Sequence, residues 1–360
     1  MFLSIYIYIF VPIVSLFAFL GVYKINNKKS FEILTLIFVL LSISIILTTR
    51  DVNAPNDMAN YSWMYDKAKD YNYIFTAYHG NMFYTFLTYL GNFFGLSKEI
   101  FFKVLSIIYL FIFTYGLKLI FQNIKYLILS IVFFSLSSTF ILLFTNVIRQ
   151  GLALSLFVLA IGLLSNNKKT FAYIILLLSI FSHFSMLPIS LIILFVFYFH
   201  KKYPDKKFIY LLLLLPVIGK ILFNSLASIG GLFHKIESLS NHAYNNNIVY
   251  VKMLILYIFL HIIYIYGKKF NLFHLFSFRF IYNIYFYLLS LILLTSPVLL
   301  LSSRFLYYTS ALIPILLAYI FYSKRNFLNI YSRYIVFLII TIFYGIFVYN
   351  YKSTASVLGI

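Results

Sequence analysis

Long stretches of this chain carry no charged residue, and this feature constrains its fold more than any other. Examples are the runs 33–48, 127–144 and 173–180. About 20 apolar residues suffice to cross the roughly 30 Å of hydrocarbon in a bilayer. The chain is 63% hydrophobic and only 10% charged, and no polar stretch is long enough to build a separate soluble domain. We therefore expect an all-α polytopic integral membrane protein with a single transmembrane domain over 1–360.

Composition excludes several classes of function. The absence of cysteine excludes disulfides, thiolate metal sites and cysteine nucleophiles. The net charge of +20 arises from lysine and arginine in short loops between apolar runs, as the positive-inside rule requires, so we expect no nucleic-acid partner. The segment 2–23 has neither a basic start nor a small-residue cleavage site, which predicts a retained first helix instead of a signal peptide.

The lysine clusters predict the orientation of the chain in the membrane. Lys24, Lys28 and Lys29 follow the first apolar segment, which places that loop in the cytoplasm and the N-terminus outside. Later basic clusters mark further cytoplasmic loops by the same rule. The result is about 12 transmembrane helices, at 2–23, 31–49, 103–121, 126–145, 148–165, 171–182, 185–199, 208–223, 249–266, 280–301, 304–322 and 334–350.

Two segments fit this count poorly. Residues 171–199 lie between two lysine-rich loops and must cross twice, which requires a turn near His183, with Pro188 able to break or kink a helix there. Residues 81–96 are short and interrupted by glycine and asparagine. We expect 81–96 to lie on the outer surface or to re-enter, because a full crossing would place Lys168 and Lys169 outside.

Polar residues concentrate in two predicted outer loops, 50–80 and 224–248. The first belongs to a larger outer region, 50–102, and carries four of the eight acidic residues of the chain together with the only tryptophan, Trp63. Ionisable groups are costly in a membrane protein and are often functional. The loop 50–80 is therefore the place where a sugar or phosphate site is expected. The loop 224–248 reads as a lid, a binding loop or a flexible connector.

Three of the six arginines, Arg50, Arg149 and Arg304, fall at predicted outer helix ends, where the positive-inside rule does not require them. The planar guanidinium suits phosphate oxygens, so three arginines on one face are candidates for holding a pyrophosphate. The alternatives are snorkelling or an ion pair with Asp51 or Asp57.

Two residues are candidates for acid–base chemistry. His183 is an isolated polar residue at the predicted outer turn, and histidine can donate or accept a proton near neutral pH. Asp57 precedes Tyr61 by one helical turn, and an outer carboxylate could take the proton of an attacking sugar hydroxyl. The histidines show no metal-binding spacing, so neither a metal site nor a cofactor is expected.

The order of these residues resembles the EpsG family of bacterial exopolysaccharide proteins, which is related in role to Wzy-type O-antigen and capsule polymerases. The resemblance rests on four groups: Arg50, Asp57 and Tyr61; Arg149, Gln150 and Ala153; His183, Ser185 and Pro188; and Arg304, Tyr307 and Tyr308. The chain departs from the family at two places. Met58 follows Asp57 where the family often has tyrosine, and His79 and Gly80 stand where it often has glutamate.

The resemblance implies a glycosyltransferase-type polymerase of the cytoplasmic membrane, with a GT-C-like fold and an active site on the outer, periplasmic face. Its substrates would be oligosaccharide repeat units on undecaprenyl pyrophosphate, and its partners membrane lipid and a polysaccharide chain-length regulator. Asp57 and His183 are the catalytic candidates. The candidates for binding pyrophosphate or sugar are Arg50, Arg149, Gln150, Arg304, Tyr61, Tyr307 and Tyr308.

Two other readings remain open. An O-antigen ligase would use the same lipid-linked donor with a lipid A core acceptor, and residue types alone separate it poorly from a polymerase. A lipid-linked oligosaccharide flippase or another transporter would have a similar number of helices, but we would expect it to carry charges along a central cavity. Here polarity gathers at one face, which favours an enzyme.

Overall fold

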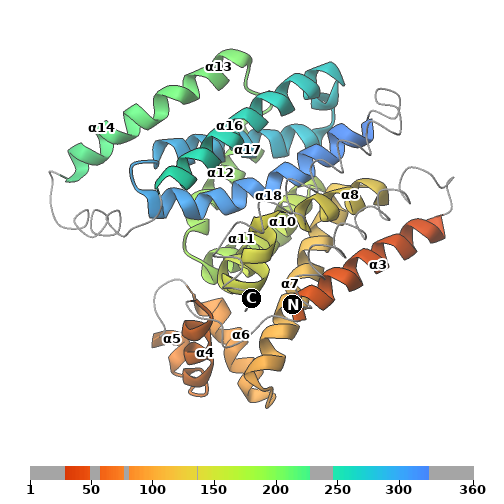
Figure 1. Cartoon of the computed structure of the whole chain (residues 1–360), viewed down its shortest axis with the longest axis vertical. Helices are drawn as coiled ribbons and strands as arrows, with labels where there is room; N and C mark the ends of the chain where they lie inside the picture. Colours follow the sequence, from red (N-terminus) through yellow and green to blue (C-terminus); the bar gives the residue numbers. More distant parts are fainter. Residues whose placement is uncertain (1–28, 49–56, 77–80, 136, 228–245, 324–360) are drawn as a thin grey trace. The chain divides into compact units, whose positions relative to one another are not determined.

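The computed structural model describes residues 29–48, 57–76, 81–135, 137–227 and 246–323. Within these ranges every regular element is a helix, as expected for an all-α membrane protein. The described residues form two compact units that divide at Met186 (Figure 1). The single domain expected from the sequence stays a prediction, and each unit is described by itself.

The first unit is built around two long apolar helices, α7 (Lys98–Ile120) and α10 (Ile148–Ser165). Around them lie the remaining helices of the unit: α3 (Lys29–Thr48), α4 (Asp57–Lys67), α5 (Tyr73–Thr76), α6 (Met82–Phe93), α8 (Ile124–Ser135), α9 (Ser138–Ile141) and α11 (Lys169–Ser182). A π-helical turn, Leu142–Asn146, leads into α10.

Two glycines let α7 and α10 approach closely. A Cβ atom at Gly116 would lie 2.6 Å from the backbone nitrogen of Leu159, and one at Gly162 would lie 2.5 Å from the backbone oxygen of Gly116. Small residues commonly bring helix backbones together in membranes, where packing replaces the hydrophobic driving force. The contact holds α10 in the centre of the unit, where most of its side chains are buried.

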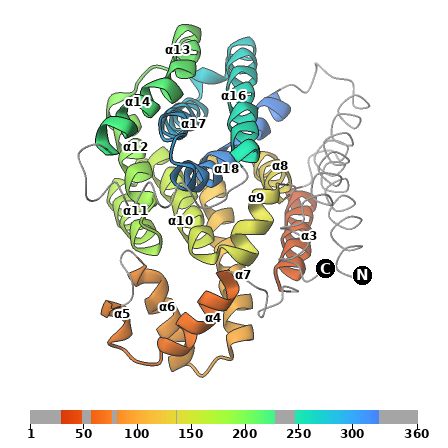
Figure 2. The ribbon, with the colours of Figure 1, turned by 60° about the vertical axis from the view of Figure 1, so that its left-hand side comes forward.

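The two ends of this unit are chemically different. At one end, Asn166 donates a hydrogen bond of 2.7 Å to the backbone oxygen of Leu119, and Lys125 of α8 pairs with Glu32 of α3 at 3.5 Å. At the other end the short helices α4, α5 and α6 pack on one another beside the start of α7 (Figure 2). The acidic segment and the Lys168 loop therefore lie at opposite ends of α10.

The second unit surrounds α17 (Phe276–Leu294), most of whose side chains are buried. Its neighbours are α14 (Leu215–Ala227), α16 (Asn246–Lys269) and α18 (Leu299–Ser323) (Figure 2). α12 (Met186–Phe199) and α13 (Lys206–Leu211) precede them. Short 3-10 turns at Leu212–Leu214 and Leu272–His274 complete the unit.

Five of the described helices are long and apolar enough to cross a membrane: Lys98–Ile120, Ile148–Ser165, Val249–Lys269, Phe276–Leu294 and Leu301–Phe321. Four shorter apolar helices are also present, and two of them, Lys169–Ser182 and Met186–Phe199, are separated at the turn expected near His183. The double crossing of 171–199 stays a prediction. Pro188 lies in the first turn of α12, where proline is tolerated. The predicted crossings 2–23 and 334–350 lie outside the described residues, and the count of about 12 stays a prediction.

Several expected boundaries differ from the structure, and the crossing expected at 208–223 comprises α13, a 3-10 turn and α14. The segment 126–145 is not one helix, because α8 ends at Ser135 and a π-helical turn precedes α10. The segment 280–301 ends at Leu294, because Pro297 cannot continue the helical hydrogen bonding. Consequently α18 begins at Leu299, and Arg304 lies inside that helix instead of opening it.

Residues 81–96 contain α6, with 12 residues. At 1.5 Å per residue such a helix is about 18 Å long, well short of the hydrocarbon thickness. It packs against α4, α5 and α11, which accords with a segment that does not cross the membrane.

The contact between α7 and α10 can be tested with Gly116→Ala. Because the new methyl group would overlap the backbone at Leu159, we expect the free energy of unfolding to fall by about 1–3 kcal/mol. The thermal midpoint of the purified protein in detergent should fall accordingly. Ala59→Val, which adds methyl groups at an exposed position of α4, is the control. An unchanged midpoint for Gly116→Ala would contradict this packing.

Candidate functional site

Three of the four residue groups picked out from the sequence meet in the first unit, where α10 begins and α11 ends. Arg149 and Gln150 occupy the first turn of α10, and His183 follows the last residue of α11. Tyr61 lies on α4 and contacts Arg149. Residues about 120 positions apart in the chain therefore share one place, as expected for a built site.

A hydrogen-bonded row joins Gln150, His183 and Ser185. The amide nitrogen of Gln150 lies 3.3 Å from Nε2 of His183, and Nδ1 of His183 lies 2.6 Å from the hydroxyl oxygen of Ser185. Gln150 and Ser185 are buried, with 4% and 8% of their surfaces exposed. Both ring nitrogens of His183 therefore have a polar partner. These contacts fix the orientation of the imidazole, as hydrogen-bond partners do for catalytic histidines.

The amide of Gln150 can support two protonation states of the histidine. In the orientation described, its nitrogen donates to Nε2 and its oxygen is buried without a hydrogen-bond partner. A half-turn of the amide group exchanges its oxygen and nitrogen. After that exchange the oxygen would accept a hydrogen bond from Nε2–H, and the ring could then be an imidazolium that donates at both nitrogens.

Arg149 is held against Tyr61. The guanidinium carbon lies 5.2 Å from the centroid of the Tyr61 ring, within the range of a cation–π contact. Burial raises the pKa of the Tyr61 phenol, while the charge of Arg149 and hydrogen bonding by its side chain and backbone oppose that rise. The charge of the Asp57 carboxylate adds to the rise in the pKa of Tyr61, so Asp57 and Arg149 each lie within electrostatic reach of the Tyr61 phenol.

Tyr61 is 1% exposed and also packs on Tyr84 of α6, with ring centroids 5.6 Å apart. A side chain with so little exposed surface is suited to positioning Arg149 and α10. The Tyr61 phenol also interacts with the backbone of Arg149 at the start of α10, where the residue before the helix makes no side-chain cap. The substrate contact expected for Tyr61 from the sequence stays a prediction.

The local backbone before α10 explains how Arg149 and Gln150 are presented. The amide of Val147 donates to the backbone oxygen of Leu142, five residues back, at 2.8 Å, which closes the π-helical turn. A Cβ atom at Gly151 would lie 2.2 Å from the backbone oxygen of Leu143, so the turn requires glycine there. Such π-helical turns often occur at functional sites.

The electrostatics of this end of α10 favour an anion. The start of a helix carries a partial positive charge and unpaired backbone amides. Arg149 adds a full positive charge in the same turn, and its Nε is buried without a hydrogen-bond partner. The arrangement offers a fixed cation and helix amides to an anion, next in sequence to the Gln150 that contacts His183.

The short helices α4 and α6 are hydrogen-bonded around the site. Tyr65 of α4 donates a hydrogen bond of 2.6 Å to the backbone oxygen of Leu96, and Asn92 donates one of 2.7 Å to the backbone oxygen of Tyr65. Trp63 is 56% exposed, on the surface of α4. Asp66 pairs with Lys98 at the surface, which separates it in role from Asp57.

The remaining candidates belong to other parts of the chain. Arg50 lies outside the described residues, as does the loop 228–245, which is most of the second predicted outer loop. Arg304, Tyr307 and Tyr308 lie on α18 in the second unit, where Arg304 is exposed and Tyr308 is fully buried. Among the described residues, no three His, Asp or Glu side chains gather closely enough to hold a metal ion.

Sequence reasoning left out two residues of the site. Ser185 was part of the histidine motif but was not a candidate, and its position two residues after a helix-ending histidine was the available signal. Tyr73 of α5 is influenced by the charge of Arg149, which opposes the effect of burial in raising its pKa. No spacing in the sequence links Tyr73 to Arg149.

Comparison with known proteins gives a family. The model of the EpsG family matches residues 33–358, nearly the whole chain. Neither the curated proteins nor the solved structures contain a significant match.

The positioning role of Tyr61 predicts a large effect of truncation. Tyr61→Ala would leave a cavity beside Arg149, and truncating a buried aromatic ring typically costs about 3–5 kcal/mol. We expect a markedly lower thermal midpoint in detergent. Tyr71→Ala is the matched control, because Tyr71 is 54% exposed and should cost far less. Equal losses for the two variants would refute the buried role.

Proposed function

The chain belongs to the EpsG family of Wzy-like polymerases, and on this basis we propose that it joins oligosaccharide repeat units carried on undecaprenyl pyrophosphate. The reaction would take place on the outer face of the cytoplasmic membrane. The observation that carries the proposal is the meeting of Arg149 and His183, through Gln150, at the start of α10. An anion-holding group and a proton acceptor are the two elements that this reaction needs.

The proposed step is a glycosyl transfer. A hydroxyl of the acceptor sugar attacks the anomeric carbon of the donor, the new glycosidic bond forms, and the bond between that carbon and the pyrophosphate oxygen breaks. The hydroxyl proton passes to a base on the enzyme, and undecaprenyl pyrophosphate leaves with the electron pair. The donor already carries a good leaving group, so the reaction requires no nucleotide.

Arg149 and the start of α10 are our candidates for stabilising the departing pyrophosphate. A fixed positive charge at the place where negative charge develops lowers the barrier without reorganisation. The contact with Tyr61 supports this role, because it limits where the guanidinium can go. We propose Arg50 and Arg304 as further arginines for the pyrophosphate, and Tyr307 for the sugar, on the motif order alone.

His183 and Asp57 are our candidates for the base. With Nδ1 held by Ser185, Nε2 is the ring nitrogen that would take the proton, once the amide of Gln150 that donates to it gives way to the acceptor hydroxyl. Asp57 lies within electrostatic reach of Tyr61, at the start of the polar helix α4. Membrane lipid and a chain-length regulator are proposed as partners on the family resemblance, and no nucleic acid is expected.

The surface glycans of a strain that lacks the gene test the proposal. Glycolipid capped with a single repeat unit, with the ladder of longer chains lost, would support a polymerase. Polymer left on the undecaprenyl carrier, with none on lipid A core, would show a ligase instead. Loss of even the single unit from the surface would show a flippase.

If Arg149 binds the pyrophosphate at two points, a positive charge alone at this position is not sufficient for polymer formation. Arg149→Lys keeps the charge but loses the planar fork of donors that binds phosphate oxygens at two points. We expect polymer formation to fall at least about tenfold, which is an increase of about 1.4 kcal/mol in the barrier. Arg279→Lys, on α17, is the control and should leave polymer formation near the level of the unaltered protein.

The measurement is the glycan ladder in a complemented deletion strain, with the amount of each variant in the membrane determined by immunoblot. Polymer at the level of the unaltered protein from Arg149→Lys would exclude the two-point phosphate contact.

Two aspartates of α4, Asp57 and Asp66, allow a second test of the proposal. Asp57→Asn removes the carboxylate next to Tyr61, whereas Asp66→Asn removes one that forms a surface ion pair with Lys98. We expect the ladder to be lost with Asp57→Asn and kept with Asp66→Asn, because surface ion pairs contribute little. The reverse order would move the base away from Asp57.

A further inference from the structure

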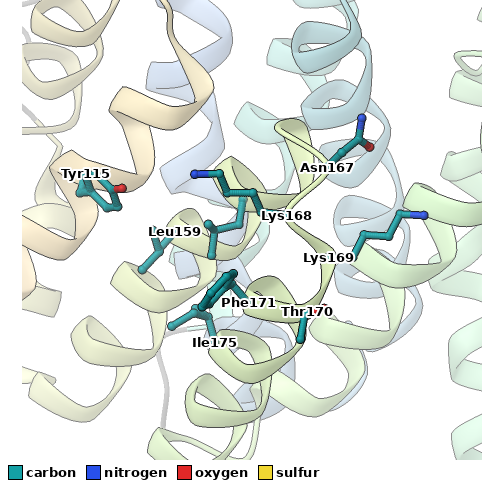
Figure 3. A pocket seen from close by; sticks show the side chains of 9 residues that line it. Tyr115, Leu159, Asn167, Lys168, Lys169, Thr170, Phe171 and Ile175 are labelled. Carbon is teal, nitrogen blue, oxygen red and sulfur yellow. The ribbon is translucent and has the colours of Figure 1, made fainter.

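A second polar place lies at the opposite end of α10 from the candidate site. There the structure has an open groove of about 570 Å³ between α7, α10 and α11 (Figure 3). This volume lies within the usual range of ligand pockets. The proposed reaction uses none of the residues that line it.

The wall of the groove is apolar and belongs to helices with membrane-like composition. Leu159 and Leu163 come from α10, Phe171 and Ile175 from α11, and Tyr115 from α7. Figure 3 shows Phe171 and Ile175 lying together in the middle of the groove. Phe171 is 66% exposed and Tyr115 is 51% exposed. Water would solvate such a wall poorly, whereas a hydrocarbon chain would cover it.

The rim of the groove is positive. Lys168 immediately precedes α11 and Lys169 is its first residue, and none of the described residues that line the groove is acidic. In Figure 3 the side chain of Lys168 extends toward Tyr115, across the groove. The first turn of α11 contains no acidic residue that could offset these lysines.

The backbone that carries Lys168 is held in place. Asn167 adopts a left-handed conformation with φ of 57°, and the amide of Lys168 donates 2.9 Å to the backbone oxygen of Leu163. Both are features of a helix C-cap. Asn166 ties the same turn to the last turn of α7 through the backbone oxygen of Leu119. The lysine is therefore presented from a defined turn at the mouth of an apolar groove.

We propose that this groove binds one anionic phospholipid, with an acyl chain along Leu159, Phe171 and Ile175 and the phosphate at Lys168. The charge and the apolar wall together select the ligand. A free phosphate would leave the wall uncovered, and a zwitterionic lipid would bring a second cation to the lysine rim. The orientation expected from the lysine clusters places the groove in the cytoplasmic leaflet, where basic residues attract anionic lipid.

The experiment measures binding without any sugar substrate, so it stands apart from the test of the proposed function. The purified protein in a neutral detergent is titrated with phosphatidylglycerol or phosphatidylcholine, and bound lipid is counted by native mass spectrometry. We expect one phosphatidylglycerol to bind in preference to phosphatidylcholine. Equal affinity for the two lipids would overturn the proposal.

Two variants locate the binding. Lys168→Gln should weaken phosphatidylglycerol binding about fivefold, as expected for one lysine at a lipid headgroup. Ile175→Trp should weaken it by filling the groove. The matched control is Lys201→Gln, since Lys168 and Lys201 are both exposed loop lysines, and it should leave the affinity unchanged.

Unchanged affinity in both groove variants would overturn the proposal, as would an equal loss in Lys201→Gln. A thermal midpoint raised as much by inorganic phosphate alone as by phosphatidylglycerol would also overturn it, because the lipid chain would then contribute nothing. Each variant is compared at matched thermal stability without lipid, which separates lost binding from lost folding.

Discussion

The close contact of α7 with α10 is the constraint on which the rest of the first unit depends. Gly116 and Gly162 remove the side chains that would keep these two backbones apart, and α10 is consequently buried along most of its length. A buried apolar helix can satisfy its own backbone but offers polar groups only at its ends. Arg149 and Gln150 at one end, and the Asn166–Lys168 turn at the other, are where the unit can meet polar ligands.

The helices themselves could largely be predicted from the sequence. The predicted span 148–165 coincides with α10, and the break of 171–199 falls at His183, because hydropathy and a polar residue between apolar runs are strong local signals. The π-helical turn before α10 could not be predicted, since it depends on the fit of Gly151 against Leu143. The end of α17 at Leu294 was missed although Pro297 was visible in the sequence, because hydropathy continues through it.

The candidate site, too, could be predicted from the sequence only in part. Arg149 and His183 could be picked out as polar residues in apolar surroundings, and motif order linked them to Asp57 and Tyr61. The connection through Gln150 and the burial of Tyr61 depend on how α4, α10 and α11 pack, and no spacing along the chain encodes that. In our proposal, Arg149 stabilises the leaving pyrophosphate and His183 accepts the proton of the acceptor hydroxyl.

Reconstitution tests the central claim most directly. The purified protein in vesicles is given a single undecaprenyl-pyrophosphate-linked repeat unit, and the products are separated by length. Our account predicts a ladder of lipid-linked polymers, with one undecaprenyl pyrophosphate released for each new glycosidic bond. Substrate that stays at one repeat unit, under conditions in which the protein remains folded, would contradict it.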